Sequence, residues 1–233
     1  MESVRELSSG ATLPAVTLSY AQSLDGSIAS FRGQRSLLSC RESRILTHRL
    51  RSAHDAVLVG IETVIADDPL LTVRLVKGGN PVPVVLDSNL RLPLSANILK
   101  NEQSPFIAAT INACRERQAT LEQLGAKVMR TAPDERGRVN LRSLLYQLWN
   151  SGVKSLMVEG GAGVITSFLS QRLVDQVVIT VAPCFLGGFN AIENPWISGY
   201  QSRRRVDLPE LKNVRYEQVG NDIVIWATLS REK

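Results

Sequence analysis

The sequence predicts an α/β protein in which a single mixed sheet is flanked by helices. Short apolar runs alternate with amphipathic helical segments over most of the chain, which is typical of parallel β-α-β units. Glycines directly follow several of these runs, as they do at strand-to-helix turns. The last two apolar segments, 214–219 and 223–229, are joined by Gly220-Asn221-Asp222, which predicts an antiparallel hairpin. We expect one domain over residues 13–230, preceded by a tail of residues 1–12.

Composition favours a soluble globular protein that binds small anions. The chain has 233 residues, 44% of them hydrophobic and 21% charged, which is enough to bury a substantial core. Its net charge is +5, but the arginines are scattered apart from Arg203–Arg205, and only 5% of the residues are aromatic. Nucleic-acid binders more often interleave a basic stripe with stacking aromatic residues. We therefore expect no nucleic-acid partner.

Cysteines, histidines and hydropathy exclude further classes. The three cysteines Cys40, Cys114 and Cys184 are far apart and form no C-x-x-C pair, and His48 and His54 are six positions apart. This predicts neither a disulfide framework nor a metal site. The first ten residues contain no apolar signal region, and no apolar run approaches ~18 residues. We expect a cytoplasmic protein with no membrane contact.

The first third of the chain predicts a strand, a loop and a helix. Residues 15–20 alternate as a strand does, and the chain then turns through residues 21–26. Asp25 precedes Gly26, so its carboxylate either caps this turn or takes a direct part in chemistry. Residues 27–35 are polar and predict a mobile loop over a site. Ser39, a residue type that favours helix N-caps, precedes a helical run with apolar positions at Ile45, Leu46, Leu50 and Ala53.

Two strands in the middle of the chain end in residues suited to anions. Residues 55–60 predict a buried strand, and the short helical turn 61–64 after Gly60 presents amides that could hold an anion. Residues 83–87 predict another strand, followed by Ser88 and Arg91. These side chains are well placed for a phosphate, although a solvated loop explains them equally well.

The following elements are predicted by caps and apolar spacing. Strands are expected at 105–110, 126–131 and 176–181. Asn112 is the expected cap of a helix that Gly125 stops, and Asn140 caps a second helix that ends at Gly152.

The stretch 155–183 organises the predicted site. A strand over Leu156–Val158 runs into Glu159-Gly160-Gly161-Ala162-Gly163, and a helix follows with Val164, Ile165, Phe168, Leu169 and Leu173 apolar. Glycines let the backbone approach a ligand, and the helix start presents free amides, so a phosphate fits here. The alternative is that the glycines only satisfy backbone geometry. A carboxylate would repel a phosphate, so Glu159 is expected to face a neutral part of a second ligand.

The ordered strings SYAQSLDG, THRLRSAHDAVLVG, TVIADDPLLTVR, VVLDSNLRLP, VEGGAG and APCFLGG resemble the reductase of riboflavin biosynthesis, from about Leu13 to Leu229. This resemblance implies a dihydrofolate-reductase-like fold, NADPH as cofactor, and reduction of the ribosyl group of a 6-(5-phosphoribosylamino)pyrimidine to a ribitylamino product. It also implies a homodimer. SYAQSLDG and THRLR are similar to the stand-alone fungal reductases, which lack the deaminase domain of the bacterial fused enzymes.

The resemblance also implies residue roles. The expected NADPH contacts are Ala21, Thr63, Asp67, Ser88, Arg91, Gly160, Gly161, Ala162, Gly163 and Val164, with Ser88 and Arg91 near the 2′-phosphate. The expected substrate contacts are Arg35, Arg51, Leu71, Arg74 and Glu159. Glu159 is also a candidate catalytic residue. Apart from the resemblance, the chemistry makes Asp25 a second candidate, for assisting protonation, with turn capping as the alternative.

The chain departs from the bacterial fused enzymes at Ser19, Arg35 and Leu37, where those typically carry Lys, Ser and Trp. The stand-alone reductases also lack that Lys and Trp. Cys184 stands where the motif often has Lys. These departures leave open the alternative that the protein is a related NADPH reductase of the same fold with another substrate. A non-catalytic nucleotide-binding module, which could touch nucleic acid through Arg203–Arg205, is the alternative from a different class.

Overall fold

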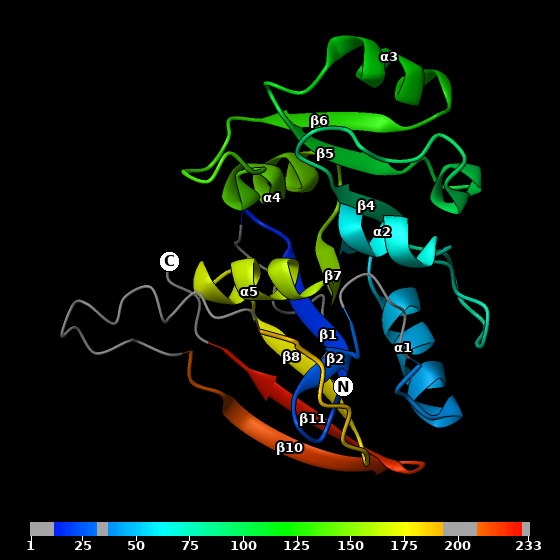
Figure 1. The fold of residues 1–233 in the computed structure, drawn as a ribbon, viewed down its shortest axis with the longest axis vertical. Coiled ribbons are helices and arrows are strands. Elements are labelled where there is room, and N and C mark those ends of the chain that lie inside the picture. Colours follow the sequence, from blue (N-terminus) through cyan, green and yellow to red (C-terminus); the bar gives the residue numbers. More distant parts are fainter. Residues whose placement is uncertain (1–11, 32–36, 193–208, 230–233) are drawn as a thin grey trace, which may run out of the picture.

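A large mixed sheet with helices on both faces dominates the computed structural model, which describes residues 12–31, 37–192 and 209–229 (Figure 1). The strands of this sheet are β1 (Ala15–Ser23), β3 (Ala56–Gly60), β4 (Val82–Leu86), β5 (Phe106–Thr110), β6 (Lys127–Thr131), β7 (Ser155–Gly160), β8 (Gln176–Ala182), β10 (Lys212–Val219) and β11 (Asp222–Thr228). The two short strands β2 (Ser27–Ala29) and β9 (Phe189–Asn190) pair separately. The helices are α1 (Arg41–Ala53), α2 (Ile61–Asp67), α3 (Arg115–Gln123), α4 (Leu141–Asn150) and α5 (Ala162–Ser170), with a 3₁₀ turn η2 (Asn97–Lys100).

The strand order is β10-β11-β8-β1-β7-β3-β4-β5-β6. All neighbours from β8 to β6 are parallel, whereas β11 runs antiparallel to both β8 and β10. The predicted mixed α/β sheet is therefore confirmed. The hairpin is confirmed as well, because Val219 pairs with Asp222 across the Gly220-Asn221 turn.

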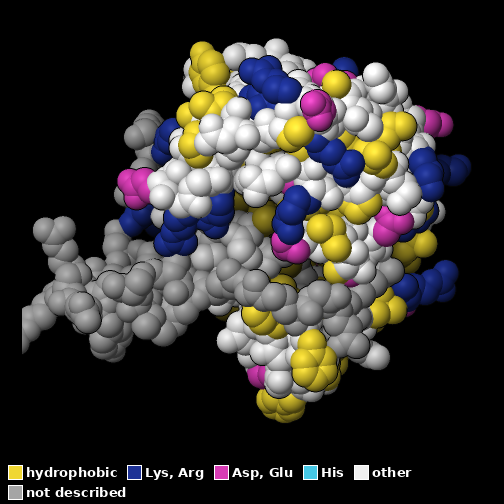
Figure 2. Space-filling model, turned by 45° about the horizontal axis from the view of Figure 1, so that its top comes forward, with side chains coloured by type: hydrophobic (Ala, Val, Ile, Leu, Met, Phe, Trp, Pro, Cys, Tyr) yellow, Lys and Arg dark blue, Asp and Glu magenta, His cyan; other side chains and the backbone are white. Residues whose placement is uncertain are grey.

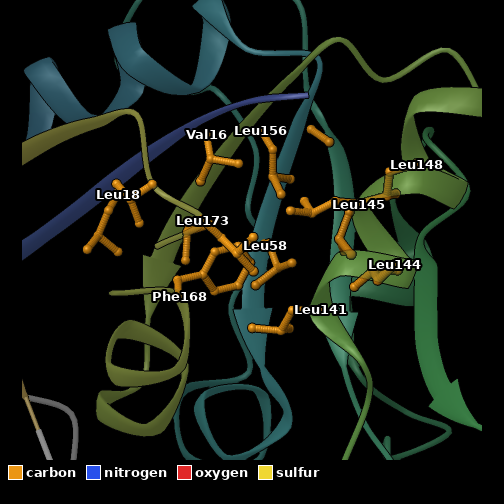
Figure 3. Close-up of a cluster of buried hydrophobic side chains, with 14 of the residues drawn as sticks. Val16, Leu18, Leu58, Leu141, Leu144, Leu145, Leu148, Leu156, Phe168 and Leu173 are labelled. Carbon is orange, nitrogen blue, oxygen red and sulfur yellow. The ribbon is translucent and has the colours of Figure 1, made fainter. Parts of the chain in front are cut away.

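Each face of the sheet is covered by its own set of helices. On one face, Leu144 and Leu148 of α4 and Phe168 of α5 pack with Val16 and Leu58 of the strands (Figure 3). On the other face, α1, α2 and α3 contribute apolar side chains to a second buried cluster. Strands buried on both faces have near-continuous apolar sequences, which is why the central strands were recognisable from sequence.

Helix caps were predicted with mixed success. The Asn140 side chain accepts the Ser143 N–H at 2.9 Å, as expected. Ser39 is not the cap of α1: the N-cap is Cys40, whose own N–H donates to the Asp222 carboxylate at 2.9 Å. Asn112 is not the cap of α3, which begins at Arg115, because residues 110–113 first form a turn.

Three boundaries also differ from the prediction. Strand β1 continues through the expected turn to Ser23, because it stays paired with β8 as far as Ala182. Residues 27–29 of the expected loop form β2. Helix α5 ends at Ser170, and Leu173 follows a turn in which Arg172 adopts φ 51°. Arg35 and Arg203–Arg205, which the sequence analysis singled out, lie outside the described part of the chain.

Strand β10 forms one edge of the sheet and is exposed over most of its length. Tyr216, near its middle, is 73% exposed. Within the ranges described above, no helix is both long and apolar enough to cross a lipid bilayer.

Candidate active site

The site is a cleft at the edge of the sheet where β1, β3, β4 and β7 end. Because these strands are parallel to their neighbours, their carboxyl ends meet at the same edge, where ligands of open α/β sheets bind. The cleft has a volume of about 1240 Å³. Single-ligand pockets are typically about 300–1,000 Å³, so this cleft has room for two ligands.

Most residues predicted for the site line this cleft. They are Ala21, Arg51, Thr63, Asp67, Arg74, Ser88, Arg91, Glu159, Gly161, Ala162, Gly163 and Val164. Asp25, Leu71 and Gly160 are not among the lining residues, and Arg35 lies outside the described residues. Of the positions that depart from the bacterial enzymes, Leu37 lines the cleft, whereas Ser19 is buried within β1.

A β-bulge brings Glu159 into the cleft. Val158 pairs with Leu58 of β3, but the next pair along is Gly160 with Val59, so Glu159 has no partner across the strands. An extra residue of this kind bends the strand and re-aims its side chain. The bulge thus explains how a carboxylate emerges at the end of an otherwise buried strand.

The glycines after the bulge are required by the backbone. Gly160 and Gly161 have φ of 128° and 84°, a region that residues with a side chain rarely adopt. A Cβ at Gly161 would lie 3.1 Å from the Thr63 hydroxyl oxygen, so the space beside it is narrow. The amides of Ala162 and Gly163 come next, in the first turn of α5, where helical amides have no acceptor within the helix. The backbone of these glycines, the amides and the Thr63 hydroxyl together fit a phosphate group.

Glu159 is bound by Arg51. The Arg51 Nε donates to one carboxylate oxygen at 2.5 Å, and Nη2 donates to the other at 2.6 Å, so the ion pair is bidentate. The side chains are only 12% and 13% exposed. Burial lowers the pKa of Arg51, but the charge and hydrogen bond of Glu159 outweigh that effect and raise its pKa overall.

Arg51 and Glu159 are both expected substrate contacts, and the structure pairs them with each other. A third Arg51 donor, Nη1, binds the Thr72 carbonyl at 3.1 Å. Three of its N–H donors are therefore committed within the protein, which leaves less of the guanidinium for a phosphate than the sequence suggested.

The segment Thr72–Arg74 is fixed along the cleft wall. The Val73 N–H donates to the Asn80 side chain at 2.8 Å, and the Arg74 N–H donates to Nδ1 of His48 at 2.9 Å. Leu71, just before the segment, has φ 54° and is 2% exposed, so its side chain packs in the core. Any contact of Leu71 with a ligand would therefore involve its main chain.

At another part of the cleft, Ser88 and Arg138 lie close together. The Ser88 hydroxyl accepts the Val139 N–H at 3.2 Å, and Arg138 Nη1 donates to the Ser167 hydroxyl of α5 at 3.3 Å. Arg91 lines the same cleft and pairs with Glu62. Sequence reasoning missed Arg138, because it lies in a polar loop that carries no motif.

Asp25 holds a turn outside the cleft lining. Its carboxylate accepts hydrogen bonds from Ser23 Oγ at 2.5 Å, from Ser27 Oγ, and from the amides of Leu186 and Gly187. The Ser23 hydroxyl and these two amides lower its pKa well below the usual range. A carboxylate this reluctant to take a proton is a poor proton donor, so the structure favours the capping role over the catalytic one.

The sequence profile of the RibD C-terminal domain family matches residues 14–225. The chain belongs to the RibD C-terminal domain family. A relative from Archaeoglobus fulgidus named 2,5-diamino-6-ribosylamino-4(3H)-pyrimidinone 5′-phosphate reductase is 36% identical over 228 residues, covering 94% of this chain and 99% of the relative. RibD of Aquifex aeolicus is 36% identical over 214 residues, and the match spans 57% of its length.

A solved structure of the Saccharomyces cerevisiae riboflavin biosynthesis reductase Rib7 matches with a TM-score of 0.73 at 27% identity. The match covers 95% of this chain and 92% of Rib7. Together with the sheet order, it confirms the dihydrofolate-reductase-like fold expected from the motifs.

Proposed function

We propose that this protein is the NADPH-dependent reductase that converts the ribosyl group of a 6-(5-phosphoribosylamino)pyrimidine to a ribitylamino group in riboflavin biosynthesis. The single observation that carries the proposal is the near-complete match, at 36% identity, to a relative named as the pyrimidinone 5′-phosphate reductase. The cleft supports the proposal, because its glycine turn at Gly160 and Gly161 fits a phosphate and a second region of the cleft contains arginines.

The chain has residues suited to hold the cofactor. We assign the diphosphate to the amides that begin at Gly161, flanked by Thr63 and Asp67, and the nicotinamide end to Ala21. When bound, a reduced nicotinamide supplies the hydride that reduces the C1′ carbon of the opened ribosylamine.

The protein's own contribution is to position the substrate and exclude water. Glu159, fixed by Arg51, would accept a hydrogen bond from a substrate hydroxyl or ring N–H. Tyr20 also lines the cleft, and burial raises its pKa to about 12, so its hydroxyl keeps its proton at physiological pH. We assign the substrate phosphate to Arg74, with a secondary part for Arg51 and Arg35.

Replacing Arg74 by alanine should raise the substrate KM by about 10–100-fold and leave the NADPH constant within about twofold. A hydrogen bond to a charged group contributes roughly 1.5–3 kcal/mol, and tenfold in binding corresponds to about 1.4 kcal/mol. Steady-state kinetics with each ligand varied in turn measure both constants. Arg142→Ala, an exposed position of α4, is the matched control. Equal damage to both constants would contradict this division of the cleft.

We assign the 2′-phosphate of NADPH to Ser88, Arg91 and Arg138. Arg138 lies beside Ser88, and the contacts of its guanidinium with described residues are long, at 3.3 and 3.4 Å, so it can turn toward an added phosphate with little loss. Arg138→Ala should therefore reduce the preference for NADPH over NADH by about tenfold, with the NADH constants nearly unchanged. An unchanged ratio of kcat/KM for the two cofactors would remove Arg138 from this site.

The proposed function is tested by following NADPH oxidation with the purified protein and each of two substrates, the diamino and the deaminated pyrimidine. Turnover with either supports the proposal and shows which form is preferred. NADPH binding without turnover of either pyrimidine would favour one of the two alternatives, a related reductase with another substrate or a non-catalytic nucleotide-binding module. Absence of NADPH binding would contradict the assignment of the cofactor. A nucleic-acid partner has little support on the face seen in Figure 2, where dark blue basic side chains lie at several separate places, interspersed with other types.

We also propose that the protein is a homodimer. The exposed edge strand β10 supports this, because an unpaired edge offers a row of backbone groups to another strand. Size-exclusion chromatography with light scattering tests it. The cytoplasmic location and the domain limits at residues 13 and 230 stay predictions.

A further inference from the structure

His48 supports the position of Arg74 from within helix α1. It lies three residues before Arg51, so both side chains project from the same side of the helix. His48 is 7% exposed and lines the cleft. Arg51 holds the Thr72 carbonyl and His48 holds the Arg74 N–H, so α1 fixes both ends of the segment Thr72–Arg74.

The hydrogen bond defines the protonation state of the ring. Nδ1 lies 2.9 Å from the Arg74 nitrogen, which can only donate, so Nδ1 must be the acceptor. A neutral imidazole has one donor and one acceptor nitrogen, which puts its proton on Nε2. A protonated ring has a donor on each nitrogen, and two N–H groups would then oppose each other at this distance.

We propose that His48 is a positioning residue for the substrate site: its neutral ring keeps Arg74 in place, and protonation of the ring releases Arg74. This inference rests on the proposed function, because it assigns Arg74 to the substrate phosphate. In this proposal His48 acts through Arg74 and does not contact the reacting atoms of the substrate or the cofactor.

The charges around the ring favour its neutral form. Burial lowers the pKa of His48, and the positive charges of Arg51 on α1 and Arg74 on the cleft wall lower it further, whereas Glu159 on β7 opposes them. Since the pKa is lowered, the ring is neutral at pH 7 and Arg74 is held. As the pH falls through this lowered pKa, the ring becomes charged and the hold on Arg74 is lost.

Two substitutions of His48 distinguish the roles of Nδ1 and Nε2. His48→Asn keeps an acceptor oxygen at the place of Nδ1, whereas His48→Gln places its amide near Nε2 and leaves the Nδ1 place without an acceptor. We expect His48→Gln to raise the substrate KM about tenfold with the NADPH constant unchanged, and His48→Asn to stay within about threefold of the natural protein. Equal effects of the two variants would overturn the proposal.

The pH profile gives a second readout. In the natural protein, kcat/KM for the substrate should fall as the pH is lowered through the depressed pKa of His48, whereas His48→Asn should show a smaller fall because its amide does not titrate. The substrate phosphate itself titrates at about pH 6, but it does so equally with both proteins, so the difference between their profiles isolates the histidine. Identical profiles would overturn the proposal.

Hydrogen exchange at the Arg74 amide tests the inference without the reaction. Followed by NMR in the free protein and corrected for intrinsic rates, the Arg74 amide should lose protection as the pH is lowered from 7 through the depressed pKa of His48. His48→Asn should show no such loss. His48→Gln should lack the protection throughout this pH range. If protection behaves in this way but no turnover is found, the hold on Arg74 stands and only its assignment to this reaction fails. If the protection is independent of pH, the proposal is overturned whatever the activity.

Discussion

Replacing Gly161 by valine is expected to abolish tight cofactor binding while the protein stays folded. The residue adopts φ 84°, and a Cβ there would lie 3.1 Å from the Thr63 hydroxyl oxygen. A branched side chain would therefore fill the space assigned to the cofactor diphosphate. We expect the dissociation constant for NADPH to rise by at least about 100-fold, equivalent to about 2.8 kcal/mol. Fluorescence titration or calorimetry with NADPH measures this directly.

Gly125→Val is the matched control for backbone strain. Gly125 has φ 89°, no described atom lies within 4 Å of the position that a Cβ would take there, and the residue has no place in the lining of the cleft. Both variants should lose roughly 1–3 kcal/mol of stability from the strained backbone, but only Gly161→Val should lose the cofactor. A Gly161→Val protein that still binds NADPH tightly would place the diphosphate elsewhere and remove the main structural support for the enzymatic interpretation.

Replacing Glu159 by alanine is the second change with a large expected effect. Arg51, only 12% exposed, would keep its charge without its main partner. Breaking one side of a buried ion pair destabilises proteins by about 3–5 kcal/mol. We expect kcat/KM to fall by about 100-fold, because the substrate would lose its hydrogen bond to the Glu159 carboxylate, and such a bond to a charged group contributes roughly 1.5–3 kcal/mol. Urea unfolding and steady-state kinetics measure the two effects.

A double-mutant cycle shows whether the ion pair itself is responsible. With Arg51→Ala and Glu159→Ala, we expect a coupling energy of about 1–3 kcal/mol in unfolding. The pair of Arg91 with Glu62, whose side chains are 47% and 72% exposed, is the control and should couple by less than about 1 kcal/mol. Additive effects at Arg51 and Glu159 would mean that the two residues act separately.

The layers of the fold were predictable because they depend on local patterns. Buried strands such as β3 are uninterrupted apolar runs, and α4 shows its apolar positions at helical spacing behind a true Asn140 cap. The glycine turn before α5 was predictable for the same reason, since Gly160 and Gly161 stand directly between an apolar run and a helix.

The connections across the site were not predictable from local patterns. Arg51 and Glu159 are 108 residues apart, and nothing in either neighbourhood indicates that each is the other's partner. The bulge that aims Glu159 depends on its pairing with β3, not on its own sequence. Arg138 reaches the cleft through a bond between Val139 and Ser88, 51 residues away.

The order of the strands also determines when the fold can be completed during synthesis. Of the strands in the sheet, β1 leaves the ribosome first, yet it lies in the middle, between β7 and β8. Its apolar side chains, including Val16 and Leu18, therefore stay unpaired until β7, which begins after residue 154, and β8, which begins after residue 175, have been translated. Contacts this distant in sequence form slowly, and unpaired strands are prone to aggregate. The nascent chain consequently depends on its final third being made before its first strand is protected.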